Sequence, residues 1–540
     1  MVPETYVSNS CESVRAIRPE SDRRIAIACF GTACAIGLVF AFVGLETHSL
    51  WYDELFTATL LEPMQGSTLL SRIATDVHPP LYLLALTVFT QLFGDGDAAL
   101  RCFSAIAACG AVVVFILATR SAFSLPARLF GAAMATGSLY WFNQAQNVRS
   151  YALCLLISAG VMALGLSLLQ ERHRRRLRLT GLLALMITGA LVHFYVTYVS
   201  LAVLILLGLF ERRDRAALSA AALFLLVAAG LYVKLVIEPY SQVSLANNWY
   251  QNTPAWYLVV LKACLQYSLG DYGLVALLLC GVAILYTRLA PAKRSASTAT
   301  APSPVHWLQS DPVTTFLVGV PLLVLAGGIV SSTLLAPNFW DRNFLVVSPF
   351  LWGLAARSYD AAVDKATLSI RLALTGALAI IVLSMSSIVT ARLPSGEAPV
   401  LYEPFRQSAT WIQSLPACRG QTLPVITTDQ PSWYKPGYAE LIYESAYGRY
   451  LQGFGRPQLV FSQELDLDKL PLALKVELQR RLDGGGCPIL AWAVHNMTPE
   501  TIAWIEDKLL ASLDRRDAAM KVATRLFEDG SVGYVLYVRR

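Results

Sequence analysis

The chain has 540 residues, of which 55% are hydrophobic and only 15% are charged, and its formal net charge is +6. Soluble globular proteins have about 25% charged residues, so this composition excludes a soluble protein and predicts an integral membrane protein. The basic runs are short and lie between apolar segments without interleaved aromatic residues, which excludes a nucleic-acid-binding protein.

The N-terminal 24 residues are polar and end in arginines, and an apolar run over residues 25–45 follows them. A run of about 20 residues has the length of one membrane span, and it lacks the small-residue cleavage site of a signal peptide. Because cytoplasmic segments are enriched in Lys and Arg, we expect residues 1–24 to be cytoplasmic and the chain to emerge on the outer face.

A first outer loop is predicted over residues 46–100. It contains a short apolar run, residues 78–93, and the turn after that run has no Lys or Arg. We therefore expect a helix that lies along the outer face, and a complete second span is the alternative.

Apolar segments and basic turns then alternate up to residue 390, and the basic turns at residues 172–176 and 211–215 fit cytoplasmic loops. An aromatic outer loop (Tyr240, Trp249, Tyr250, Trp256) and a flexible linker over residues 288–312 separate some of the segments. The predicted segments are 101–119, 129–145, 151–170, a hairpin of two short helices over 179–210, 216–236, 272–287, 313–335, 343–356 and 372–390. Residues 25–390 thus form an α-helical polytopic membrane domain of about 11 transmembrane helices with juxtamembrane helices on the outer face.

The character of the sequence changes in residues 391–540, which we expect to form a soluble α/β domain on the outer side. Strand-like runs alternate there with amphipathic stretches. The strand-like runs are 423–427, 488–494 and 532–538, and the amphipathic stretches are 470–482 and 499–513. A disulfide between Cys418 and Cys487 is plausible if this region is extracytoplasmic.

Two adjacent carboxylates, Asp53 and Glu54, follow the first span. Acidic residues at a membrane surface are costly unless they are paired or used. Consecutive side chains point in different directions, so one acid can face a substrate while the other anchors the segment. Because aromatic and apolar residues flank the pair on both sides, we favour a functional pair over a solvated loop.

Asp76 and His78 precede the short apolar run. Asp76 is interpreted equally well as a helix cap or as a site residue, whereas His78 is expected in the site because it lies near the Asp53 segment. His193 and Tyr195 fall at the predicted tip of the hairpin over residues 179–210, where a site residue and a satisfied interior histidine are equally plausible.

Three arginines, Arg101, Arg149 and Arg342, fall on the outer side, where the positive-inside bias does not explain them. A carboxylate partner would explain Arg101, and Glu54 is the nearest candidate. Arginine forks suit phosphate recognition, so Arg149 and Arg342 indicate an anion site near Tyr151. Each arginine taken alone could instead be a snorkelling anchor.

As an ordered series, these residues resemble the GT-C superfamily of glycosyltransferases that depend on polyprenyl-phosphate sugars, specifically the branch of protein O-mannosyltransferases and aminoarabinose transferases. The similar pieces are Trp51-Tyr52-Asp53-Glu54, His78-Pro79-Pro80-Leu81-Tyr82, Arg101-Cys102-Phe103-Ser104-Ala105, Gln146-Asn147-Val148-Arg149-Ser150-Tyr151, His193-Phe194-Tyr195 and Asp341-Arg342-Asn343-Phe344. One departure is Asn147, where members of the family commonly have Glu.

The resemblance implies that Asp53 is the catalytic residue, that Glu54 and Arg101 hold it, and that His78, Arg149, Tyr151 and Arg342 bind the donor phosphate. It also implies an inverting transfer of a sugar from a polyprenyl-phosphate donor to a lipid, glycan or protein acceptor. The expected location is the periplasmic face of a bacterial inner membrane, among membrane lipids.

Two alternatives stay open at this point. A divalent metal ion could use Asp53, Asp76 and His78 as ligands, although their spacing does not demand one. A transporter or flippase for an anionic lipid-linked substrate is the second functional hypothesis. Such a protein should have internal repeats and charged or broken helices near mid-membrane, and the sequence has no evident repeat.

Overall fold

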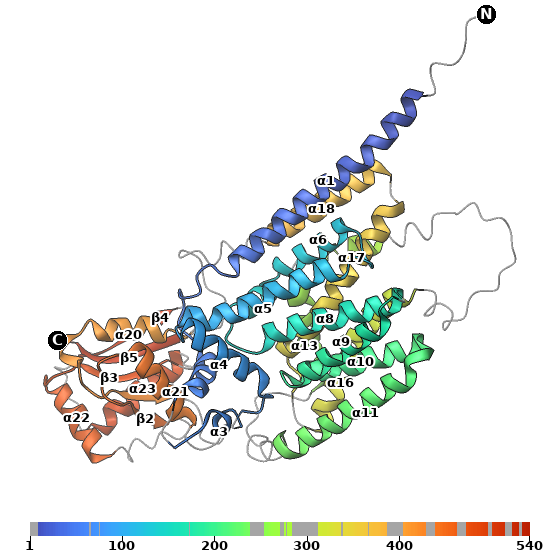
Figure 1. The fold of residues 1–540 in the computed structure, drawn as a ribbon. Coiled ribbons are helices and arrows are strands. Elements are labelled where there is room, and N and C mark those ends of the chain that lie inside the picture. The colour runs from blue at the N-terminus through green and yellow to red at the C-terminus, as the bar shows by residue number, and fades with distance from the viewer. Residues whose placement is uncertain are drawn as a thin grey trace, which may run out of the picture.

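The structure of the chain is a computed structural model (Figure 1). It describes residues 9–63, 66–74, 76–171, 173–237, 253–269, 275–276, 278–282, 311–335, 338–365, 367–385, 403–427, 438–461, 471–494, 499–513, 521–528 and 532–539. Helices predominate up to residue 385, and five strands lie in the C-terminal part.

The first helix, α1 (Asn9–Phe40), is longer at its N-terminal end than the predicted span and ends five residues before residue 45. It lies beside α18 (Leu368–Met385), so the first and last described helices of the bundle are neighbours (Figure 1). The polar segment before residue 25 is therefore partly helical, and the apolar residues after Phe40 form turns, with Gly44 at a φ of 73°.

The predicted outer loop over residues 46–100 is mostly helical, although the sequence predicted a helix only over residues 78–93. It contains α2 (Tyr52–Leu61), α3 (Leu69–Ile73) and α4 (Leu81–Phe93). Asp53 and Glu54 lie in the first turn of α2, where acidic side chains interact favourably with the helix dipole. With 13 residues, α4 is shorter than a membrane span needs, as expected for the run over residues 78–93.

The prediction of a single helix over residues 129–145 is wrong. This segment is divided between α6 (Leu125–Thr136) and α7 (Leu139–Ala145). The break falls at Gly137 and Ser138, and the Ser138 hydroxyl accepts a hydrogen bond from the Trp141 amide at 3.4 Å. Ser138 thus caps a new helix, a role that hydropathy alone does not reveal.

A helical hairpin is present where the sequence predicted one. After α5 (Asp97–Ala118) and α8 (Tyr151–Gln170), the chain forms α9 (Arg175–Ala190) and α10 (Phe194–Phe210), and His193 precedes α10. Arg175 forms ion pairs with Glu211 at 2.8 Å and with Asp214 at 2.6 Å. The two basic turns therefore meet at the end of the bundle opposite the hairpin tip.

The remaining helices of the bundle surround these. They are α11 (Arg215–Tyr232) with the π-helical turn η2 (Val233–Ile237), α13 (Pro254–Leu269), α16 (Pro312–Leu334), the 3₁₀ helix η4 (Asp341–Val347) and α17 (Ser348–Lys365). The helix α13 corrects the predicted outer loop around Trp256. The predicted span at 343–356 is split between η4 and α17. Tyr240, Trp249, Tyr250, most of 272–287 and residues 288–310 lie outside the described residues.

Five helices in the described part are long and apolar enough to cross a membrane. They are Glu20–Phe40, Asp97–Ala118, Tyr151–Gln170, Arg215–Leu235 and Pro312–Leu334. Shorter apolar helices lie at Leu81–Phe93, Phe194–Phe210, Pro254–Cys264 and Ser369–Val382. The length and apolar composition of these helices make the chain an integral membrane protein. The count of about 11 spans stays a prediction.

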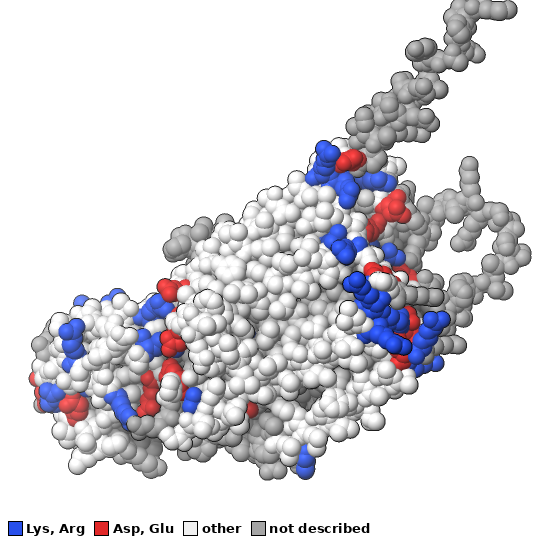
Figure 2. Space-filling view, in the orientation of Figure 1, with Lys and Arg blue, Asp and Glu red and all other residues white. Residues whose placement is uncertain are grey.

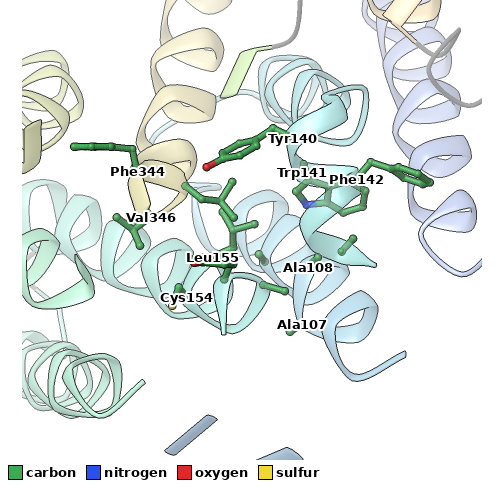
Figure 3. Close-up of a cluster of buried hydrophobic side chains, with 14 of the residues drawn as sticks. Ala107, Ala108, Tyr140, Trp141, Phe142, Cys154, Leu155, Phe344 and Val346 are labelled. Atoms are coloured by element: carbon green, nitrogen blue, oxygen red, sulfur yellow. The ribbon is translucent and has the colours of Figure 1, made fainter. Parts of the chain in front are cut away.

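A buried cluster in the bundle joins the elements that carry the candidate residues (Figure 3). Ala107 and Ala108 of α5 pack there near Trp141 and Phe142 of α7, Leu155 of α8 and Phe344 of η4. Arg101 lies at the start of α5, Arg149 just before α8 and Arg342 in η4. Packing of these helices against one another thus fixes the relative positions of the three arginines.

The C-terminal part contains one five-stranded sheet in the order β2-β1-β3-β5-β4. The β1 strand is parallel to β2 and β3, and β5 is antiparallel to β3 and β4. The strands are β1 (Pro424–Thr427), β2 (Gln458–Phe461), β3 (Ile489–Ala493), β4 (Lys521–Glu528) and β5 (Val532–Arg539); the helices are α20 (Phe405–Gln413), η5 (Pro416–Cys418), α21 (Tyr438–Tyr450), α22 (Leu472–Leu482) and α23 (Pro499–Ser512).

The sequence predicted three of these strands and both amphipathic helices but missed β2 and β4. A disulfide joins Cys418 to Cys487, in agreement with the expectation from the sequence. The proposed domain boundary at residue 391 lies outside the described residues and stays a prediction.

Asp97, at the start of α5, connects the bundle to the C-terminal part. Its carboxylate accepts a hydrogen bond from the Tyr450 hydroxyl at 2.6 Å, lies 3.3 Å from Arg449 and also pairs with Arg406. The starts of the helices that carry Asp97 and Asp53 therefore face the sheet-containing part of the chain.

Charged side chains gather at two ends of the molecule, and a broad surface between them is almost free of charge on the face drawn in Figure 2. One charged end belongs to the C-terminal part, and a basic group lies at the far end of the helices (Figures 1 and 2). An uncharged band between two charged ends is the distribution expected for a protein that spans a bilayer.

Candidate active site

The site includes the first turn of α2, where the side chains of Asp53 and Glu54 point in different directions. Glu54 points into the bundle and its side chain is only 1% exposed, whereas the Asp53 side chain is 22% exposed. Neighbouring residues on a helix point about 100° apart, so one carboxylate is buried while the other reaches an accessible surface. The expectation that the two acids face different surroundings is confirmed.

Glu54 and Arg101 form the ion pair that the sequence predicted. The guanidinium donates to both carboxylate oxygens, at 2.6 Å and 3.1 Å, in a bidentate arrangement. Arg101 also donates to the carbonyls of Leu45, His48 and Ser49 at 2.7–2.9 Å. Because the guanidinium is saturated, it fixes the segment that leads into α2.

Glu54 links α2 to the segment before α8 as well. The amide of Val148 donates to Glu54 Oε1 at 2.8 Å, and Val148 immediately precedes Arg149. On the same segment, Asn147 Oδ1 accepts a hydrogen bond from the Trp51 indole at 3.2 Å. Asn147 therefore holds the residue before α2, a contact that its neutral amide supplies and that the sequence did not predict.

Asp53 faces Arg342, and its Oδ2 lies 3.2 Å from the Arg342 guanidinium. Arg342 is 21% exposed and lies over the Tyr151 ring, 6.0 Å from its centroid. The sequence predicted both residues for the site but not their pairing, because 289 positions separate them. The pair remains open to an incoming ligand on the exposed side of both groups.

Arg149 is the second cation of the site and is 9% exposed. It donates to the Thr57 hydroxyl at 3.2 Å, one helical turn beyond Asp53. Burial would lower the pKa of Arg149, but the carboxylates of Asp53 and Asp76 raise it. Arg149 thus keeps its positive charge in a nearly dry environment, where a cation attracts an anionic ligand strongly.

Asp76 and His78 form a close pair. His78 Nδ1 lies 2.9 Å from Asp76 Oδ1, and the His78 amide donates to the same oxygen at 3.2 Å. Burial would raise the pKa of Asp76, but the interactions with His78 and Arg149 lower it to about 2. In the described structure Asp76 does not cap α4, whose cap position is Pro80, so the helix-cap interpretation is wrong.

His193 lies beside residues of the site, whereas Tyr195 contacts a neighbouring segment. The His193 ring lies 5.4 Å from the His78 ring and 5.7 Å from the Tyr151 ring, measured between centroids. The Tyr195 hydroxyl instead contacts Asn338 at 3.1 Å, which ties α10 to the segment before η4. His193 therefore joins the site, and Tyr195 positions the segment that leads to Arg342.

Glu403 is a residue near the site that the sequence did not indicate. Its Oε2 accepts a hydrogen bond from the Tyr52 amide at 2.7 Å, and its carbonyl accepts one from Ser49 at 2.5 Å. It thus stabilises the start of α2 from the C-terminal part. The only sequence signal was an acid shortly after the last predicted span.

The possible metal ligands named from the sequence lie apart from one another in two separate pairs. No group of three or more His, Cys, Asp or Glu side chains comes together within the described residues to hold a metal ion. Asp53 faces an arginine and Asp76 faces His78, so the hypothetical ligands Asp53, Asp76 and His78 are engaged separately.

No protein-family model and no curated protein matches the chain. Among solved structures, ArnT from Cupriavidus metallidurans bound to undecaprenyl phosphate is similar, with 13% identity over 94% of this chain and 98% of that one and a TM-score of 0.49. The apo state of the same protein gives 13% identity, coverage of 95% and 98%, and a TM-score of 0.43.

An oligosaccharyltransferase from Archaeoglobus fulgidus, in a complex with Zn and sulfate, gives 12% identity, covers 93% of this chain and 72% of that one, and has a TM-score of 0.41. These three solved structures are similar to the chain over most of its length. At such identities and TM-scores they place none of the site residues, which are defined here by their own contacts.

Proposed function

We propose that this chain is an inverting membrane glycosyltransferase that moves a sugar from a polyprenyl-phosphate donor to a hydroxyl of a lipid, glycan or protein acceptor. The observation that carries the proposal is the pairing of an accessible carboxylate, Asp53, with Arg342 beside the buried cation Arg149. A base and a phosphate-binding pair in one place are what this reaction requires.

In the proposed reaction, the acceptor oxygen forms a bond to the anomeric carbon while the bond from that carbon to the phosphate oxygen breaks. The proton of the acceptor hydroxyl moves to Asp53, and the electron pair of the broken bond leaves with the phosphate. Arg149, Arg342 and His78 stabilise the negative charge on that phosphate. Tyr151 lies under Arg342 and orients its guanidinium.

We also propose that the site and the C-terminal part face the outside of a bacterial inner membrane. The basic turns lie at the opposite end of the bundle, as expected for cytoplasmic loops (Figure 2). The disulfide between Cys418 and Cys487 supports an oxidising compartment for the C-terminal part.

The proposal is tested by product analysis. Membranes that contain or lack the chain are supplied with polyprenyl-phosphate sugars carrying a radiolabel in the sugar. Transfer of label to lipid, glycan or protein only in membranes with the chain supports the proposal. If the label instead crosses the bilayer while it stays attached to the polyprenyl phosphate, the protein is a flippase and the proposal is wrong.

A further inference from the structure

His193 carries a buried polar atom that the mechanism above does not use. The side chain is 1% exposed and precedes α10. Its Nδ1 accepts a hydrogen bond from the Tyr195 amide at 3.2 Å, so the proton of a neutral imidazole lies on Nε2. That Nε2 is buried and has no hydrogen-bond partner among the described residues. Buried donors are nearly always paired, so an orphan of this kind calls for a ligand.

The neighbours of the His193 ring are residues of the candidate site. His78 and Tyr151 lie beside the ring, and Phe194 stacks on it with a centroid separation of 4.6 Å. Phe194 offers no hydrogen-bond acceptor, and the Tyr195 amide already occupies Nδ1. Nε2–H is therefore the one polar group of this side chain that is free to bind a ligand in the described structure.

The charges around His193 keep it neutral. Burial is the largest cause that lowers its pKa, and the interactions with His78, Arg149 and Arg342 lower it further, while Asp76 acts in the opposite direction. A neutral imidazole whose Nδ1 accepts a hydrogen bond can only donate from Nε2. Since cations surround the ring, the ligand atom that suits this donor is an oxygen carrying negative charge.

We infer that His193 is a phosphate-binding residue whose Nε2–H donates a hydrogen bond to an oxygen of the lipid-linked phosphate held by Arg149 and Arg342. The inference rests on the proposed function, because that function supplies the phosphate. A neutral donor adds a directional contact without adding a further positive charge to the two arginines. It also strengthens as negative charge develops on the leaving phosphate.

Two variants separate this role from helix capping. In His193→Asn, the amide oxygen replaces Nδ1 and retains the cap of α10, but the donor at the Nε2 position is lost. In His193→Gln, the longer side chain places an amide N–H near the Nε2 position and loses the cap. We expect undecaprenyl phosphate to bind His193→Asn roughly tenfold more weakly than wild type and His193→Gln within about threefold of wild type. Thermal unfolding should show the opposite order, with His193→Gln the less stable variant.

The binding measurement uses the purified full chain in detergent and three probes: undecaprenyl phosphate, undecaprenol and inorganic phosphate. A loss for His193→Asn confined to undecaprenyl phosphate supports the inference. Equal loss with undecaprenol shows that no phosphate contact was removed. Binding of inorganic phosphate as tight and as dependent on His193 as that of the lipid makes free phosphate the ligand, and either result overturns the inference.

The same experiment distinguishes this inference from the proposed function. If wild type binds undecaprenyl phosphate and Arg149→Lys weakens binding while His193→Asn does not, His193 has only a structural role and the proposed function stands. If wild type does not bind undecaprenyl phosphate, both are wrong.

Discussion

At the scale of single residues, two adjacent acids have different surroundings. Glu54 is fully engaged by Arg101 and Val148, so it has no capacity left to accept a proton from a substrate. Asp53 has one arginine partner and an accessible side chain. Sequence position alone could not separate their roles, whereas the pairing of Glu54 with Arg101 could be predicted because the charge bias of the loops left Arg101 unexplained.

The arginine forks give the first prediction. Replacing Arg149 or Arg342 by Lys keeps the charge but removes the planar fork that can bind two phosphate oxygens. We expect the catalytic efficiency for the polyprenyl-phosphate donor to fall roughly tenfold or more in each variant. Arg120→Lys, on an exposed turn, is the matched control. Wild-type kinetics in both site variants would mean that these arginines only anchor helix ends.

Asp76 gives a prediction about pH. Its pKa is lowered to about 2 in the folded chain from an ordinary value of 3.8, so its ionised form stabilises the fold above about pH 4. That contribution disappears as the pH falls toward 2, and it corresponds to about 2 kcal/mol. The difference in unfolding free energy between wild type and Asp76→Asn should therefore shrink between about pH 6 and about pH 2.

Chemical unfolding in detergent measures this difference at both pH values. Asp95→Asn, at an exposed aspartate, serves as the control and should show no such change. A difference for Asp76→Asn that is the same at both pH values would show that the carboxylate is not stabilised by its neighbours.

At the scale of secondary-structure elements, the start of α2 is held from three directions. Arg101 binds Glu54, Asn147 binds Trp51, and Glu403 binds the Tyr52 amide. These contacts come from α5, from the segment before α8 and from the C-terminal part. Such support fixes the direction of the Asp53 side chain, which a base in a transfer reaction needs.

Breaking the strongest of these contacts should destabilise the fold. Glu54→Ala leaves the buried Arg101 guanidinium without its carboxylate, and losing one partner of a buried ion pair costs about 3–5 kcal/mol. We expect a clearly lower melting temperature of the purified chain, with Glu46→Ala at an exposed acid as the control. A Glu54→Ala protein as stable as the control would show that the pair contributes nothing to the fold.

The elements also show what hydropathy can predict. The hairpin of α9 and α10 was predicted because residues 179–210 form a mostly apolar run of 32 residues, longer than one span needs, and a single histidine marked its tip. The break between α6 and α7 was missed because Gly137 and Ser138 barely change the local hydropathy, although Ser138 caps α7. The helix α13 was missed because its aromatic and polar residues read as a loop. The contact between Asp53 and Arg342 was unpredictable because no local pattern connects residues so far apart.

At the scale of the whole molecule, the C-terminal sheet lies at one end, and a group of basic side chains lies at the other end (Figures 1 and 2). The start of α2, which carries Asp53, contacts Glu403 of the C-terminal part. A transporter should have its charged groups near mid-membrane. The acids and arginines of this site instead cluster at helix starts, which suits the proposed transfer from a lipid-linked donor to a water-accessible acceptor group.

This arrangement predicts the orientation in the membrane. Alkaline phosphatase, a reporter that is active in the periplasm, should be active when it is fused after residue 540. In the turn between α8 and α9, only a reporter that is active in the cytoplasm should give a signal. A fusion after residue 540 that is active only with a cytoplasmic reporter would mean that the predicted number of spans is wrong by one, and residues 78–93 are the first place to look.

The central claim, that Asp53 accepts the proton of the acceptor hydroxyl, is tested most directly by the transfer rate of purified Asp53→Asn. Asparagine keeps the shape of the side chain but cannot take up the proton. We expect the rate to fall about 10²–10⁴-fold, while the variant still folds and still binds undecaprenyl phosphate. Glu46→Gln should retain the wild-type rate. An Asp53→Asn protein that transfers sugar at more than about a tenth of the wild-type rate would contradict the role of Asp53 as the base.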